Sequence, residues 1–243
     1  MRRDRHAGKA IMVNIVTRWR TILLAASMFI APLFILAGHL LTVPADEQPT
    51  QWVHDISAAT GTYVLAQTLI AAGAVLLIVN CIGFMRLAVG RGGTLVTIGS
   101  VLVGTAALGL GVGNGMFGII MGTLLPAHPS IAVQVATLGG SAPAANIPWL
   151  LAPALPAGLV LIAVGLTQAR TAPLWLPIIL GLGGLLFLVS GSGGIVTMLL
   201  LLPLAVGIAG LGLVLLRGSR ALALHPAARA VQTNAASSAR QHG

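Results

Sequence analysis

Six long runs of apolar residues, joined by short connections, constrain this chain more than any other feature of its sequence. Such runs predict membrane-spanning helices, because the hydrocarbon core of a bilayer is about 30 Å thick and a helix rises 1.5 Å per residue. Only 7% of the residues are charged, against about a quarter in soluble domains. We therefore expect an all-α, polytopic membrane protein whose six helices are Ile22–Leu41, Tyr63–Met85, Leu95–Phe117, Trp149–Leu166, Leu174–Val189 and Ile195–Leu216.

The thirteen Lys and Arg residues occupy only alternate connections. Six precede the first run, two follow the second, one follows the fourth and four follow the sixth. Positive residues in short loops stay in the cytoplasm during insertion, so we expect both termini to be cytoplasmic in a bacterial inner membrane. The predicted organisation is a basic segment over residues 1–20, a transmembrane domain over 21–217 and a disordered cytoplasmic tail over 218–243.

The net charge of +9 is explained by this orientation. Nucleic acid is not a predicted partner, because no aromatic residues interleave with the basic ones on a folded face. The first run could be a removable signal peptide, with cleavage after Ala45. Its apolar stretch exceeds the usual 7–15 residues of a signal sequence, so we expect it to be retained.

Glycine is concentrated in the third predicted helix. Steps of seven, four, three and four residues place five glycines on one face, which predicts close helix packing and a possible contact with a second copy or a membrane partner: Gly104, Gly111, Gly115, Gly118 and Gly122. The stretch from Gly109 to Gly115 predicts a weakened or broken helix. A G-x-G-x-x-G spacing that starts at Gly113 lacks the preceding strand of a dinucleotide site, so no cofactor is predicted.

Three polar side chains share the predicted outer depth, namely His39, Gln67 and Asn114. They are candidates for an outward-facing ligand vestibule, and the alternative is hydrogen bonding between helices. No charged residue lies at mid-depth, which disfavours proton or ion coupling.

No catalytic or metal-binding motif is present. Asp46, Glu47, His54 and Asp55 lie in the first outer connection and His128 in the second, with no metal-ligand spacing. We expect a solvated loop there, with a membrane enzyme that uses these acids and His54 as a remote alternative.

Two classes of function remain. The first is a non-enzymatic packing, interaction or lipophilic-ligand-binding protein. The second is a small transporter for a neutral or lipophilic solute, because a cut after the third helix gives two halves of opposite orientation. Pro32 interrupts the first helix of one half, and Pro153 and Pro156 interrupt the first of the other.

The segment over residues 44–102 resembles uncharacterised multipass membrane proteins of actinobacteria. The resemblance rests on an acidic outer loop and on the end of the second helix, at Gly83, Arg86, Leu87, Arg91 and Gly92. It implies a bacterial inner-membrane protein of unknown function and carries over no site residues.

Overall fold

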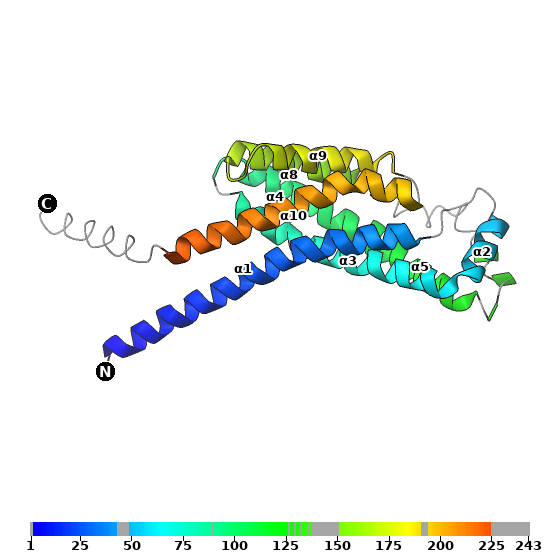
Figure 1. Cartoon of the computed structure of the whole chain (residues 1–243), viewed down its shortest axis with the longest axis horizontal. Coiled ribbons are helices and arrows are strands. Elements are labelled where there is room, and N and C mark those ends of the chain that lie inside the picture. The colour runs from blue at the N-terminus through cyan, green and yellow to red at the C-terminus, as the bar shows by residue number, and fades with distance from the viewer. Residues whose placement is uncertain are drawn as a thin grey trace, which may run out of the picture.

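The computed structural model describes residues 2–42, 49–88, 90–125, 127–128, 130–131, 133–135, 137, 151–190 and 194–224. Over these residues the chain is helical, with no strand. Its elements are α1 (Arg2–Leu41), α2 (Pro49–Ala58), α3 (Thr60–Leu87), α4 (Gly93–Ala106), the π-helix η1 (Ala107–Gly113), α5 (Asn114–Leu124), α8 (Ala154–Ala169), α9 (Trp175–Phe187) and α10 (Gly194–Leu224). Figure 1 shows the long helices running side by side, with α2 at one end of the bundle and the N-terminus at the other. We call the end of the bundle at which α2 lies the α2 end.

Four helical stretches are long and apolar enough to cross a membrane, namely Arg18–Leu41, Thr60–Leu87, Gly93–Leu124 and Gly194–Gly218. The helices α8 and α9 are apolar but shorter, with 16 and 13 residues. All six predicted runs are thus helical, and four of them have the length of a membrane span within the described residues.

Several predicted boundaries are wrong. The helix α1 begins at Arg2 rather than Ile22, so the basic N-terminal segment continues the first helix. The helix α8 begins at Ala154 after a turn over Leu151 to Pro153, and the predicted start at Trp149 lies outside the described residues. The last helix continues to Leu224, so the first seven residues of the predicted disordered tail are helical; residues 225–243 lie outside the described residues.

The helices close into a ring in chain order. The helix α1 packs on α3 and on α10, α3 on α4, α4 on α8, α8 on α9, and α9 on α10. Large side chains fill the middle of this ring, among them Phe84, Leu159, Ile162 and Ile208, none more than 1% exposed. Many of the outward-facing side chains are Leu, Ile and Val. An apolar exterior around an apolar interior is what a bilayer solvent permits, because lipid supplies no reason to hide apolar groups.

Glycines bring the helices of this ring into backbone contact. A Cβ atom added at Gly38 of α1 would lie 2.9 Å from Ala66 O of α3, and one at Gly73 of α3 would lie 3.1 Å from Ala31 O of α1. The same reciprocity occurs between α4 and α8, where Gly99 faces Gly158. Small residues allow close approach, and close approach drives helix association in lipid through van der Waals packing.

Candidate functional site

The three predicted vestibule residues lie at a similar level of the bundle but not around one cavity. Gln67 of α3 is 8% exposed, and its side chain lies against Gly118 of α5. Gly38, beside His39, contacts Ala66 and Ile70 on another side of α3. Neighbouring positions on a helix are about 100° apart, so His39 points away from the contact that Gly38 makes. No hydrogen bond that the structure shows joins any two of these three residues.

Each of the three nevertheless has a distinct environment. The Nδ1 atom of His39 is buried without a hydrogen-bond partner. Asn114 is half-buried at the first residue of α5, one turn before Gly118. The structure therefore places Gln67 in the seam between α3 and α5, and Asn114 is the first residue of α5. His39 lies on a different side of α3.

Four of the five predicted glycines form that seam. A Cβ atom added at Gly115 would lie 2.8 Å from the Cβ of Ala71, and one at Gly118 would lie 2.5 Å from the Cγ of Gln67. Gly111 and Gly122 make similar contacts with Ala74 and Val64 of α3. This face is occupied by α3 within the chain itself.

Gly104 does not belong to the seam, because a Cβ atom there would meet nothing within 4 Å. The reason is the π-helix between Gly104 and the other glycines. The predicted weakened or broken helix at Gly109 to Gly115 is in the structure a continuous helix with a π turn. A π turn holds about one residue more than an α turn. Each extra residue rotates the following positions by about 100°, so the regular spacing of the sequence does not give a common face.

A buried polar contact that the sequence reasoning missed joins α1 to α3. Asn80 is fully buried, and its Oδ1 lies 2.7 Å from Ser27 Oγ. Ser27 Oγ also lies 2.8 Å from Leu24 O, yet a hydroxyl has one hydrogen to donate. Exchange of the amide oxygen and nitrogen of Asn80 resolves this: Ser27 then donates to Leu24 O and accepts from Asn80. An asparagine within an apolar run was the sequence signal for this contact.

In either orientation one part of the Asn80 amide is left without a partner in the interior, as the Nδ2 atom is in the structure. Close by in sequence, Ser100 Oγ of α4 donates to the Cys81 carbonyl over 3.5 Å. These contacts tie α1, α3 and α4 together through neutral groups. They offer no acid, base or nucleophile arrangement for catalysis.

The predicted outer loop is partly a helix. Trp52, Val53 and Ile56 of α2 face inward, and Val53 and Ile56 belong to a buried cluster with Tyr63, Met121 and Leu125. The Trp52 and Tyr63 rings meet edge to face with centroids 6.3 Å apart. The spacing of the three apolar residues on one side of a short helix gives α2 an amphipathic character.

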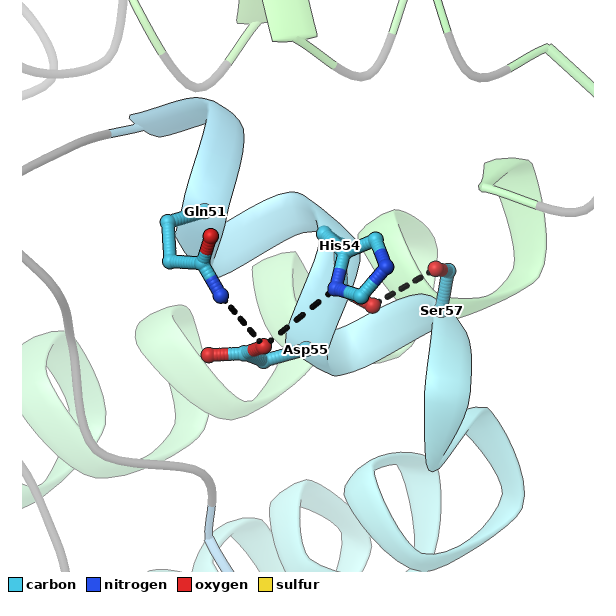
Figure 2. A network of polar contacts seen from close by, with 4 residues as sticks. All are labelled: Gln51, His54, Asp55 and Ser57. Carbon is cyan, nitrogen blue, oxygen red and sulfur yellow. Dashed lines mark hydrogen bonds and ion pairs between the residues drawn. The ribbon is translucent and has the colours of Figure 1, made fainter.

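Figure 2 shows the polar side of α2. Gln51 Nε2 donates to Asp55 Oδ1 over 3.0 Å, and His54 Nδ1 lies 3.4 Å from the same oxygen. Ser57 Oγ donates to the His54 carbonyl. The His54 side chain is 75% exposed, His128 is also exposed, and Asp46 and Glu47 lie outside the described residues. No group of three metal-ligating side chains occurs in the part of the chain that the structure describes.

Two spaces on the surface of the helix bundle are lined by apolar residues and not by the polar residues described above. A groove of about 490 Å³ runs between α8 and α9 near the α2 end, lined by Pro153, Pro156, Ala157, Val160, Leu161, Leu185 and Leu188. A much smaller space of about 10 Å³ lies between α1 and α10 beside Pro32. All of these lining residues are apolar, and none is His39, Gln67 or Asn114.

Comparison of the chain with models of protein families, with curated proteins and with solved structures finds no match.

Proposed function

We propose that this is a six-span protein of the bacterial inner membrane, with both termini cytoplasmic, which binds a lipophilic chain without catalysis. The six arginine side chains that the structure describes support the orientation. They are exposed and lie in the halves of the helices, or in the turns between helices, that are away from the α2 end: Arg18, Arg20, Arg86, Arg91, Arg170 and Arg217. The positive-inside rule assigns that end to the cytoplasm.

The groove between α8 and α9 carries the proposed binding activity. Its space of about 490 Å³ is wide open to the outside of the helices rather than enclosed, so that an occupant enters it sideways from the lipid layer. Its lining offers no hydrogen-bonding side chain. An occupant must therefore be apolar over the part that enters the groove, as the acyl chain of a phospholipid is.

The lengths of α8 and α9 favour a lipid as the occupant. With 16 and 13 residues, they extend about 24 Å and about 20 Å at 1.5 Å per residue. A bilayer core of about 30 Å is thicker than either helix. The groove lies at the end where α8 begins and α9 ends, so an acyl chain that enters it would fill the apolar layer that these helices leave uncovered.

A photoactivatable lipid tests this proposal. Phosphatidylglycerol with a diazirine in one acyl chain is added to the detergent-purified protein at one probe per protein, and the labelled residues are mapped by mass spectrometry. We expect the label on Ala157, Val160 and Leu161, and its loss in Ala157→Trp, which fills the groove. Val164→Trp, an exposed position two turns further along α8, is the matched control and should keep the label. Equal labelling of all outward-facing residues of α8 and α9 would contradict the proposal.

A second candidate is a transporter for a neutral or lipophilic solute. It is favoured by prolines and a π-helix in corresponding helices of the two halves. Pro32 lies inside α1 and Pro156 near the start of α8, while η1 interrupts the third helix and Pro203 lies inside α10. Interrupted helices in corresponding places of two halves are a pointer to a transport site, and prolines and π turns are where such interruptions form. Protein-dependent efflux of neutral solutes from reconstituted liposomes is the expected result, and leak rates equal to those of empty liposomes would exclude this candidate.

A further inference from the structure

The π-helix η1 interrupts an otherwise α-helical stretch of 32 residues, Gly93–Leu124. Three of its seven residues are glycine: Gly109, Gly111 and Gly113. Single π turns inside α-helices are rare and are found frequently at functional sites. A π turn contains one residue more than an α turn. When a π turn becomes an α turn, the additional residue moves out of the turn, and the helix that follows must rotate.

The closed seam between α3 and α5 depends on that additional residue. With η1 in the π form, Gly111, Gly115, Gly118 and Gly122 face α3. Conversion of η1 to an α-helix rotates α5 by about 100° and advances it by about 1.5 Å along its axis. Each position that faces α3 is then taken by the preceding residue. The four glycines are replaced by Leu110, Asn114, Phe117 and Met121.

These four side chains cannot fit where the glycines fit. A single Cβ atom at Gly118 would already lie 2.5 Å from the Gln67 side chain, and Phe117 would bring a whole ring to that place. The helices α3 and α5 must therefore separate when η1 becomes α-helical. We propose that η1 is a π-to-α switch that opens the seam between α3 and α5 over Gln67.

Opening of the seam exposes the polar side chains that it buries in the closed form. Gln67, buried under Gly118 in the closed form, loses its cover. Asn114 arrives beside Ala71, one turn along α3 from Gln67. Two neutral amides then face an opening near the α2 end, which suits a neutral hydrogen-bonding solute rather than an ion.

The helix α2 stabilises the closed form. Met121 of α5 and Leu125, which directly follows α5, belong to the buried cluster under α2. The other members of this cluster are Val53, Ile56 and Tyr63. Rotation of α5 moves Met121 from its buried place under α2 to the place of Gly122, beside Tyr63 and Val64 of α3. Release of α2 and opening of the seam are therefore coupled steps of one transition.

Disulfide formation between α3 and α5 tests the switch. An added Cβ at Gly122 would lie 3.8 Å from the Cβ of Val64, within the separation of about 3.5–4.5 Å that disulfides have. In full-length protein that carries Cys81→Ala and is reconstituted in lipid vesicles, Val64→Cys is paired with Gly122→Cys, Met121→Cys or Thr123→Cys. The π form predicts the link to position 122. The α form turns position 121 toward Val64, so brief approaches of the separated helices trap the link to 121, and neither form turns position 123 toward α3.

We expect oxidation with copper phenanthroline to link position 64 with 122 and also with 121, with 123 at background. Deletion of Gly113, an exposed residue of η1, removes the additional residue while leaving α5 in its closed position. This deletion should abolish the link to 121 and retain the link to 122. Linking of 122 alone would show a fixed helix and overturn the switch. Equal linking of 121 and 123 would show unspecific motion, and absence of every link would refute the seam itself; both outcomes also overturn the proposal.

Discussion

Gly99 of α4 and Gly158 of α8 lie backbone against backbone. A Cβ atom at Gly99 would come within 2.5 Å of Gly158 O, and one at Gly158 within 2.6 Å of Gly99 O. Gly92, which directly precedes α4, and Gly165 of α8 make the same reciprocal contact seven residues away. The two pairs run in opposite order along the chain, so α4 and α8 are antiparallel. This contact joins the first half of the described helices to α8, α9 and α10 on one side of the ring.

Substitution at this contact should separate α4 from α8. For Gly158→Val we expect the free energy of unfolding to fall by about 1–3 kcal/mol or more, because no side chain can be accommodated without a backbone shift. The measurement is unfolding in mixed detergent micelles, followed by circular dichroism.

The matched control is Gly104→Ala, since a Cβ there meets nothing within 4 Å. Alanine is favoured over glycine in a helix by about 1 kcal/mol, so this variant should be at least as stable as the wild type. Equal losses in both variants would show that helix flexibility, rather than the contact of Gly99 with Gly158, sets the stability.

The hydrogen bond between Ser27 and Asn80 should couple α1 to α3. In a double-mutant cycle of Ser27→Ala and Asn80→Ala, we expect a coupling free energy of about 0.6 kcal/mol, and at most about 1.7, as for other hydrogen bonds between membrane helices. Thr68 is an exposed residue of α3 whose hydroxyl bonds within its own helix. A cycle of Thr68→Val with Ser27→Ala should show no coupling, and coupling there would mean that the method reports a global effect.

Removal of Ile56 should release α2. This side chain is fully buried in the cluster with Tyr63 and Met121. We expect Ile56→Ala to weaken the docking of α2 by about 2–5 kcal/mol, which accelerates amide hydrogen exchange over residues 49–58 by at least about tenfold. Ser57→Ala, on the exposed side of α2, should leave exchange unchanged. If both variants exchange alike, α2 does not depend on this cluster.

Zinc should not bind at α2. His54 and Asp55 are neighbours on an exposed surface, and the described residues provide no third ligand near them. Micromolar zinc is therefore expected to shift the Tm of the wild type no more than that of His54→Ala/Asp55→Ala. A larger shift in the wild type would establish a metal site with ligands beyond the described residues.

Two features of the sequence led to expectations by a local physical rule. The long apolar runs predicted helices because an unpaired peptide group in hydrocarbon is costly. The glycine-rich stretch from Gly109 to Gly115 predicted a weakened or broken helix, and the structure has the π-helix η1 over Ala107–Gly113, without a break. The glycine face was only partly predictable, because the rotation that η1 introduces separates Gly104 from Gly111 without changing their spacing in the sequence.

The candidate site was predicted less well than the fold. Depth in the membrane can be counted along a helix, so the shared level of His39 and Gln67 could be expected. The direction of each side chain depends on the rotation of α3 relative to its neighbouring helices. The depth of a residue in the membrane does not specify this rotation. Asn80 was not predicted as part of a site, although its amide lies within an apolar run of the sequence. Its partner Ser27 is known only from the packing of α1 on α3.

The sequence by itself determined that this chain is helical and suited to a bilayer, since composition and run length decide how peptide groups meet lipid. Its Lys and Arg positions led to the expectation that both termini share the cytoplasmic side. Only the tertiary structure decided which glycines touch which helices, that α2 packs over the end of α3, and that an apolar groove forms between α8 and α9. Those outcomes depend on packing between residues far apart in the chain, where small differences in shape select one arrangement among many that the same hydropathy pattern allows.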